Sequence, residues 1–245
     1  MSDPVEANRV IDEREFNTHH LPHLLNYVIP IVPKGEWPAS GVLVSAGGRH
    51  FVATAAHCIV GTFRVVKSLE PLQLHRSYEG RVRELRILGI ERHASLDVGY
   101  VEIADPECAE LGLEQLAFEA ITEGTVQIVG YPQVLAHVDQ RSLSIGQGTF
   151  GTSIIDRTAN RILLSFPKSG WKLDGSGAWV ESEFPHHPKG FSGGACFGVM
   201  KTPGLVERVE YKLLGIQYAW DKRSRELHAV PIKQWHEFLV DKAGL

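Results

Sequence analysis

Residues 41–58 read Gly-Val-Leu-Val-Ser-Ala-Gly-Gly-Arg-His-Phe-Val-Ala-Thr-Ala-Ala-His-Cys, and this stretch sets the pattern for the chain. Two apolar runs, 41–45 and 49–54, lie on either side of a glycine-containing break, and each has the length of a β-strand. The 24 glycines and 13 prolines repeat this punctuation along the sequence. Short runs of Val, Ile, Leu and Phe between such breaks indicate strands rather than long amphipathic helices.

Outward from this stretch, further runs of the same kind make the whole chain mainly β. The candidate strands are 41–45, 49–54, 63–66, 81–88, 98–103, 125–129, 143–150, 161–166, 194–199 and 212–218. Sheets with this many short strands close into sandwiches or barrels. One helix is expected at the end, because Pro231 suits a first helical position and Ile232, Trp235, Phe238 and Leu239 then share one face. We expect this helix to pack as a lid on a barrel.

Composition describes an ordinary soluble globular protein. The 245 residues suit one large domain or two small ones, and 43% hydrophobic with 22% charged residues excludes a disordered chain. No apolar run reaches transmembrane length. The net charge of −4 leaves no basic surplus for phosphates or anionic lipid, so we expect no nucleic acid and no membrane as partners.

Cysteine usage indicates a reducing compartment. Cys58, Cys108 and Cys196 are an odd number without the spacing of a disulfide framework or a zinc cluster. The first nine residues lack the basic and apolar regions of a secretory signal, and residues 1–20 form a polar segment that we expect to be poorly ordered. The sequence therefore predicts a cytoplasmic protein with no metal and no cofactor.

Three local sequences carry chemistry: Thr54-Ala55-Ala56-His57-Cys58, Leu96-Asp97-Val98-Gly99-Tyr100-Val101 and Gly190-Phe191-Ser192-Gly193-Gly194. Acyl transfer to a serine hydroxyl needs a base, a carboxylate that holds this base in one tautomer, and backbone donors for the developing oxyanion. The three sequences contain a residue of each kind.

Each candidate residue has a local context that suits its role. His57 follows an apolar run and small alanines, which lets the backbone turn sharply at the end of a strand. Asp97 precedes an apolar strand, where a carboxylate can be half buried against a ring N–H. Ser192 has glycines on both sides, and their conformational freedom allows the N–H groups of Gly190 and Ser192 to form an oxyanion hole.

Together the three sequences resemble the histidine, aspartate and nucleophile signatures of trypsin-like (chymotrypsin-fold) serine peptidases, in the same His, Asp, Ser order. The likeness runs from about Gly41 to the end of the last helix. It implies two antiparallel six-stranded barrels with a C-terminal helix and a triad in the cleft between them. The implied activity is that of an endopeptidase that cleaves polypeptides through an acyl-enzyme.

The resemblance also implies a division of the chain. After the polar segment 1–20, residues 21–120 would form the first barrel with His57 and Asp97. Residues 121–231 would form the second barrel with Ser192, and residues 232–245 the helix. The stretch 119–123 is the candidate connection between the barrels.

Departures from the family pattern concern activation. No cysteine precedes Cys58, so we expect a free, buried thiol where secreted members have a disulfide. Phe191 stands where digestive and clotting members carry the aspartate that pairs with a freshly cut amino terminus, so that ion pair is not available. Residues 30–33, Pro-Ile-Val-Pro, are expected to begin an extended strand instead. The chain looks more like the bacterial, intracellular branch without a PDZ module.

Substrate preference remains open between two readings. The resemblance places His186 at the floor of the specificity pocket and His187 and Lys189 along its wall, which favours a polar or acidic side chain over Arg or Lys. It also implies that Tyr218, Ala219 and Trp220 pair with the substrate backbone. There the bulk of Trp220 would narrow the pocket and favour small residues.

Other functional classes remain as alternatives. A peptidase fold that binds a polypeptide without cutting it is one, and a peptidase held latent until a partner protein reorganises the loop at Gly190 is another. The Gly-x-Ser-x-Gly elbow of α/β-hydrolases is disfavoured because its alternating helices are missing. The glycines at 146, 148 and 151 predict a hairpin rather than a dinucleotide site.

Overall fold

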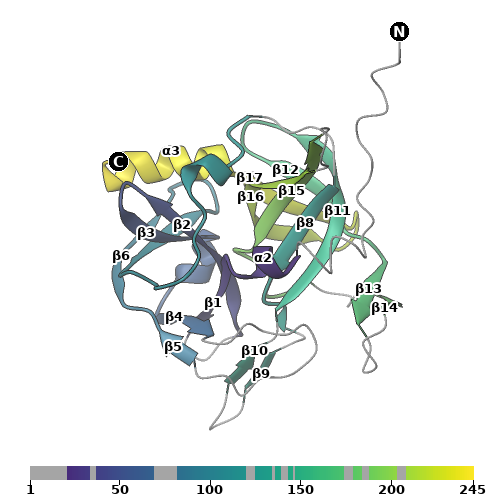
Figure 1. The fold of residues 1–245 in the computed structure, drawn as a ribbon, viewed down its shortest axis with the longest axis horizontal. Coiled ribbons are helices and arrows are strands. Elements are labelled where there is room, and N and C mark those ends of the chain that lie inside the picture. Colours follow the sequence, from purple (N-terminus) through teal and green to yellow (C-terminus); the bar gives the residue numbers. More distant parts are fainter. Residues whose placement is uncertain are drawn as a thin grey trace.

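A computed structural model describes most of the chain. The described residues are 21–33, 37–68, 82–119, 125–133, 136–138, 143–145, 147–173, 179–183, 188–202 and 208–245. The segment 1–20 and most of the stretch 119–123 lie outside them. Figure 1 shows two β units next to each other and a C-terminal helix. The predicted chymotrypsin-like, two-barrel β fold with this helix is confirmed.

The first unit is a single antiparallel sheet with the strand order β5-β4-β1-β2-β3-β7-β6. Its strands are β1 (Val28–Pro33), β2 (Ala39–Ala46), β3 (Arg49–Thr54), β4 (Phe63–Ser68), β5 (Val82–Glu84), β6 (Ile87–Arg92) and β7 (Gly99–Ile103). The expected strand start at Pro30 is part of β1.

This sheet has seven strands, but its two outer strands are consecutive in the chain. Only Leu85 and Arg86 separate β5 from β6. The backbone N–H of Leu85 donates to Val65 at 2.8 Å, and the carbonyl of Arg86 accepts from Ala104 at 2.9 Å. The bent segment 82–92 therefore pairs with β4 at one end and β7 at the other, which is how a corner joins sheet edges. If β5 and β6 are counted as one bent strand, the sheet has the six strands that were expected.

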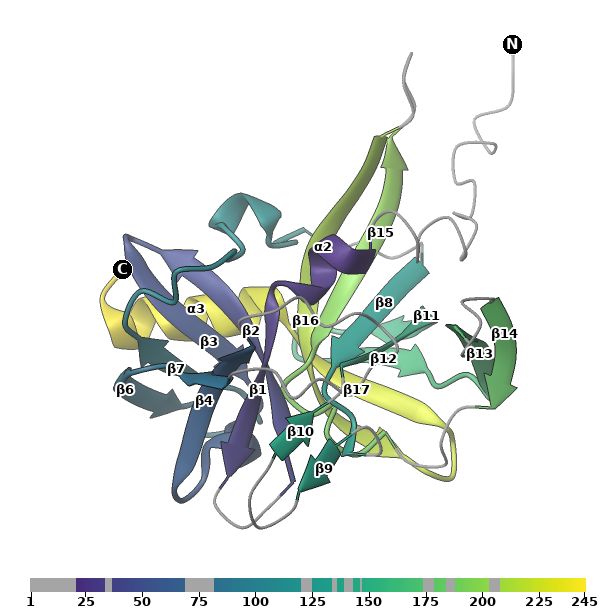
Figure 2. The same ribbon diagram turned by 60° about the horizontal axis from the view of Figure 1, so that its bottom comes forward.

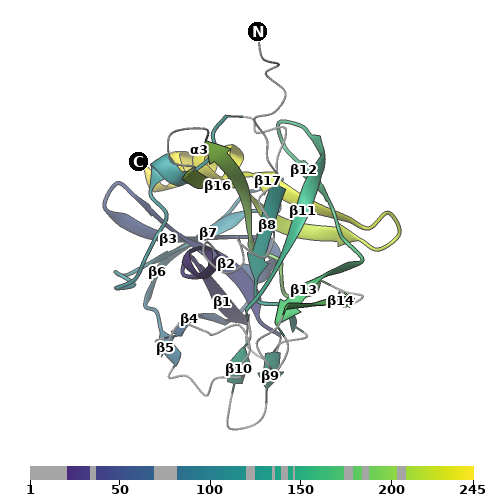
Figure 3. The same cartoon turned by 45° about the vertical axis from the view of Figure 1, so that its right-hand side comes forward.

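The second unit is a closed barrel with the order β11-β12-β17-β16-β15-β8 (Figure 2). Its strands are β8 (Thr125–Gly130), β11 (Gly148–Arg157), β12 (Ile162–Ser165), β15 (Ala195–Thr202), β16 (Arg208–Asp221) and β17 (Glu226–Pro231). Two small hairpins stand outside it, β9 (Ala136–Val138) with β10 (Leu143–Ile145), and β13 (Ser169–Leu173) with β14 (Trp179–Glu183) (Figure 3).

Several elements differ from those expected. The run 143–150 is divided between β10 and β11, and β11 continues to Arg157 through an irregularity near Ile154. Strands β9, β13, β14 and β17 and a short helix, α2 (Leu21–Leu25), were not anticipated. β17 escapes local detection because its apolar residues become buried only by pairing with β12 and β16, which are distant in sequence.

The C-terminal helix α3 (Ile232–Ala243) follows β17 directly but packs on the first unit (Figure 1). Trp235 is completely buried, and its indole N–H donates to the carbonyl of Gly99 at 3.1 Å. The ring of Phe238 lies 5.6 Å from that of Tyr100. Gly244 ends the helix in the left-handed conformation, with φ of 67°. The helix therefore ties the second barrel to the strand that follows Asp97.

Within the described residues, no helix is both long and apolar enough to cross a membrane.

Candidate active site

His57 lies in η2 (Ala56–Ile59), a single 3-10 turn that follows β3. Ala55, Cys58 and Ile59 are buried and anchor the turn in the first unit. The His57 side chain is left 50% exposed at its edge. Cys58 is buried and forms no disulfide, as the sequence predicted.

Asp97 lies in the bend just before β7 and faces His57. One carboxylate oxygen accepts from the ring Nδ1–H at 2.7 Å, and the other accepts from the backbone N–H of His57 at 3.0 Å. The contact follows from strand register, because Thr54 at the end of β3 pairs with Gly99 at the start of β7. The turn after one strand and the bend before the other thus share one end of the sheet. Holding Nδ1–H in this way leaves Nε2 available to accept a proton.

His57 and Asp97 shift each other's pKa toward the charged forms. The hydrogen bond to Asp97, followed by that to the Cys58 thiol, raises the pKa of His57 above its ordinary value of 6.5, although burial opposes the shift. Burial would raise the pKa of Asp97, but the hydrogen bonds from the His57 ring and backbone hold it below its ordinary 3.8. Asp97 therefore stays ionised and makes His57 a stronger base.

Ser192 lies at the junction between the two units, in a segment that we call the nucleophile loop (residues 188–194). Its carbonyl accepts from the backbone N–H of Ser40 in β2 at 2.8 Å, which ties the loop to the first unit. Its hydroxyl is 3.5 Å from the carbonyl of Tyr218, which accepts from it. Among the described residues, this hydroxyl has no hydrogen bond to His57. The structure thus joins His57 to Asp97 directly, whereas Ser192 is joined to Ser40 and Tyr218 and not to His57.

Tyr218 connects the two halves of the site. Its carbonyl is the acceptor for the Ser192 hydroxyl. Burial raises the pKa of its phenol, while the charge of Arg161 lowers it and the charge of Asp97 raises it by a smaller amount. The pairing of β16 with β17 shifts between Gln217 and Ala219, so Tyr218 is the extra residue of a bulge. Bulges commonly redirect a side chain beside an active site.

The glycines of the nucleophile loop are required by close contacts. Gly190 has φ of +92°, and a Cβ there would lie 2.3 Å from the carbonyl oxygen of Tyr131. Gly193 has φ of +82°, and a Cβ there would lie 1.9 Å from the carbonyl oxygen of Ser40. Neither position accepts a side chain.

The two predicted oxyanion donors remain available. The N–H groups of Phe191, Gly193 and Gly194 donate to backbone carbonyls at 3.2, 2.7 and 2.7 Å. The N–H groups of Gly190 and Ser192 donate to no described residue. Two such donors with one residue between them are what a developing oxyanion requires.

The predicted specificity residues are only partly described. His186 and His187 lie outside the described residues. Lys189 is exposed, and its carbonyl accepts from the N–H of Gln133 at 2.7 Å. The ring of Trp220 packs on Phe166 with centroids 5.5 Å apart. The roles of these residues and of Ala219 in substrate binding remain predictions.

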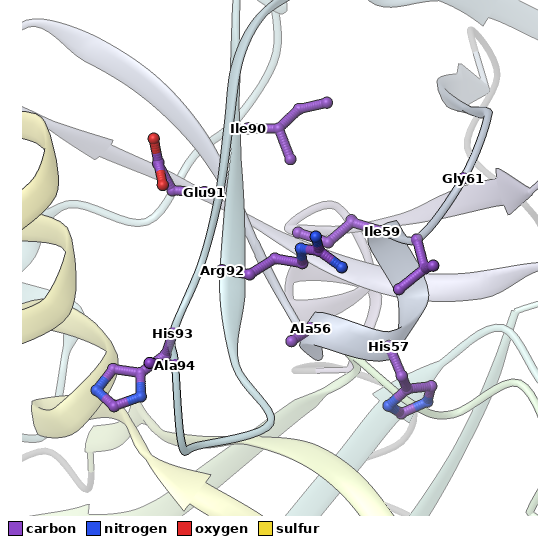
Figure 4. Close-up of a pocket in the computed structure, with 10 residues that line it drawn as sticks. Ala56, His57, Ile59, Gly61, Ile90, Glu91, Arg92, His93 and Ala94 are labelled. Carbon is purple, nitrogen blue, oxygen red and sulfur yellow. The ribbon is translucent and has the colours of Figure 1, made fainter.

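A hollow of about 710 Å³ lies beside His57, between η2 and the end of β6 (Figure 4). Figure 4 shows Arg92 reaching toward η2, while Glu91 and His93 point to the side of α3. Sequence reasoning missed Arg92, because the strand predicted at 81–88 ends before it. The exposure of the last three residues of β6, Ile90 to Arg92, is visible only in the structure. No three His, Cys, Asp or Glu side chains are grouped as a metal site in the part of the chain that is described.

No protein-family model matches this sequence, and no curated protein is significantly similar to it. Solved structures do resemble it. The serine endoprotease from Yersinia pestis matches at a TM-score of 0.56 with 16% identity over 90% of this chain, which spans only 65% of that protein. HBP matches at 0.57 with 13% identity over 91% of this chain and 94% of its own.

A third structure is neuropsin, a serine protease expressed in the limbic system of mouse brain. It matches at a TM-score of 0.56 with 16% identity, over 97% of this chain and 99% of its own. Identities this low establish a shared fold and leave the chemistry to the residues of the site. The fold of this chain is that of the trypsin-like serine proteases.

Proposed function

We propose that this protein is a serine endopeptidase that cleaves polypeptides through an acyl-enzyme, with Ser192 as nucleophile, His57 as general base and Asp97 as the group that orients it. The observation that carries the proposal is the pair of hydrogen bonds that the Asp97 carboxylate accepts from the ring and the backbone N–H of His57, at 2.7 and 3.0 Å. The N–H groups of Gly190 and Ser192, which donate to no residue in the described part of the chain, support it.

The reaction begins when the Ser192 hydroxyl leaves the carbonyl of Tyr218 and turns to His57. Its oxygen attacks the peptide carbonyl carbon as Nε2 of His57 takes the proton, and Asp97 stabilises the resulting imidazolium. The N–H groups of Gly190 and Ser192 bind the oxyanion. His57 then returns the proton to the departing amine, which leaves an ester on Ser192. Water, activated by His57, hydrolyses the ester and restores the hydroxyl.

Substrate would lie along β16 and extend past His57. The backbone of Tyr218 and Ala219 would pair with it, and the hollow lined by Arg92 would take one of its side chains. Arg92 brings a positive charge to this hollow, which favours an acidic or polar residue there. A small residue beside Trp220 remains the other preference. We place this activity in a cytoplasm.

The test is covalent labelling followed by turnover. A phosphonofluoridate should modify Ser192, and mass spectrometry of a digest would locate the adduct. Hydrolysis of fluorescein-labelled casein should fall about 10⁴- to 10⁶-fold in Ser192→Ala and in His57→Ala, by the behaviour of other triads. Undiminished hydrolysis by purified Ser192→Ala protein would refute the proposal.

One observation favours a second function, a binding module that holds polypeptides without cutting them. The Ser192 hydroxyl donates to Tyr218 and not to His57. If this arrangement persists when a polypeptide binds, no attack follows. An unlabelled Ser192 together with retained binding of denatured casein would support this alternative. Labelling only after addition of a cell extract would instead indicate a latent enzyme that a partner protein activates.

A further inference from the structure

We infer that Ser40 is a positioning residue of the proposed peptidase, and that it holds the nucleophile loop from the first unit in the conformation that leaves both oxyanion donors without a partner among the described residues. The inference rests on the proposed function. It assigns to the Ser40 hydroxyl in β2 the part that the ion pair between an aspartate and a freshly cut amino terminus has in digestive and clotting members of the trypsin-like family. Ser40 belongs to none of the three sequence signatures.

Ser40 is completely buried and makes a hydrogen bond through every polar atom. Its hydroxyl donates to the carbonyl of Gly190 at 2.8 Å and accepts from the N–H of Tyr131 at 2.8 Å. Its own N–H donates to the carbonyl of Ser192 at 2.8 Å, and its carbonyl accepts from the Thr54 hydroxyl at 2.7 Å. Ser40 of the first unit thus hydrogen-bonds the carbonyls of the residues on both sides of Phe191, Gly190 and Ser192.

Each oxyanion donor belongs to a peptide plane whose carbonyl is held. The carbonyl of Lys189 accepts from Gln133 at 2.7 Å, and that of Phe191 accepts from within the loop at 2.7 Å. In a trans peptide the C=O and N–H groups point in opposite directions. Holding these carbonyls on one side therefore directs the N–H groups of Gly190 and Ser192 to the other.

The plane between these donors depends on Ser40. Its carbonyl is that of Gly190, whose partner is the Ser40 hydroxyl, and its N–H donates to Pro188 at the longer distance of 3.2 Å. Gly190 has φ of +92° and carries no side chain that could restrict rotation. Without the hydroxyl, this plane keeps only the longer hydrogen bond of its N–H, and Gly190, which joins it to the plane of the Gly190 N–H, loses a restraint on that side.

Phe191 explains why a hydroxyl is needed. Its ring is 5% exposed and meets Phe150 edge to face with centroids 5.3 Å apart. These contacts fix the side chain, but a phenyl ring makes no hydrogen bond that could orient the neighbouring carbonyls. The restraint on the Gly190 carbonyl comes instead from outside the loop, from the Ser40 hydroxyl.

The experiment compares Ser40→Ala and Ser40→Cys with the unmodified protein, and uses p-nitrophenyl acetate as the probe. The burst of nitrophenol counts the competent sites, and its rate constant measures acylation at each site. Thr152→Val is the matched control, because it also removes a buried hydroxyl that donates to a backbone carbonyl, that of Ser165 in the second barrel. Circular dichroism verifies that each variant is folded.

We expect Ser40→Ala to acylate about 10²-fold more slowly with an unchanged burst amplitude, the cost typical of a misplaced catalytic group. Ser40→Cys keeps a weak donor, so its acylation rate constant should lie between those of the unmodified protein and Ser40→Ala. If the alanine variant does not fold, the cysteine variant tests the role of Ser40. The ascending limb of the pH profile should not move, because His57 and Asp97 are untouched. Thr152→Val should match the unmodified protein.

Two results would overturn the inference. A merely structural role for Ser40 would reduce the burst amplitude and leave the rate constant of the remaining sites within about twofold of the unmodified protein. If the unmodified protein gives a normal burst and the Ser40 variants acylate at an unchanged rate, the role of Ser40 is rejected and the proposed function stands. No burst and no phosphonofluoridate adduct in the unmodified protein reject the proposed function, and the role of Ser40 with it.

Discussion

Replacing Asp97 by asparagine should separate the chemistry of the site from its stability. The carboxylate accepts two hydrogen bonds from His57, one from the ring and one from the backbone. An amide has a single acceptor oxygen. If this oxygen keeps the backbone N–H, its NH₂ group faces Nδ1, and the ring proton must move to Nε2. His57 then presents a donor where it needs an acceptor for the Ser192 proton.

The expected magnitudes differ widely. Turnover should fall about 10⁴-fold, which is the usual cost of the wrong tautomer and corresponds to ~5.4 kcal/mol of transition-state stabilisation. Stability should change by about 1 kcal/mol or less, because the two side chains are 50% and 33% exposed and water screens their attraction. A large kinetic effect without a large thermal effect is the signature of an orienting group.

The pH profile gives the direction of a second effect. His57 must be neutral to accept a proton, and Asp97 raises its pKa, so activity of the unmodified protein should rise with pH through a midpoint above 6.5. In Asp97→Asn this midpoint should move to lower pH, since the charge that favours the imidazolium is gone. Casein hydrolysis per titrated site from pH 5 to 9, with thermal melts followed by circular dichroism, measures both effects. Turnover above about a tenth of the unmodified rate, or an unmoved midpoint, would refute the reasoning.

Two further predictions concern stability, measured by urea denaturation. Trp235→Phe should lower the free energy of unfolding by about 1–3 kcal/mol, because the buried carbonyl of Gly99 loses the indole N–H that donates to it. Lys233→Ala, on the exposed side of the same helix, should cost little. Equal urea midpoints for the two variants would contradict this prediction. Phe191→Asp should cost about 3–5 kcal/mol at neutral pH by burying an unpaired carboxylate. Burial raises the pKa of such a group, so the loss should grow as pH rises above ~4. Phe191→Leu is its control, and a pH-independent loss would argue against this cause.

Local sequence determined the parts that depend on neighbouring residues. The apolar runs at 41–45 and 49–54 become β2 and β3, and the face shared by Ile232, Trp235 and Phe238 becomes the buried face of α3. The glycines around Ser192 indicated a loop with unusual backbone angles, which the φ values of Gly190 and Gly193 bear out. These features follow from side-chain periodicity and from the absence of a Cβ, and both can be read within a few residues.

Which of these parts meet depends on contacts between residues that are far apart in the sequence. The contact between His57 and Asp97 depends on the register of β3 against β7, and the corner at Leu85 depends on pairing with two different strands. The hold of Ser40 on Gly190 crosses 150 positions of sequence. The local sequence does not indicate such hydrogen bonds, because a serine suits a strand or a turn and its partner comes from a distant part of the chain. The sequence therefore indicated the groups that we propose to react, and the packing of the two units determines what holds them in place.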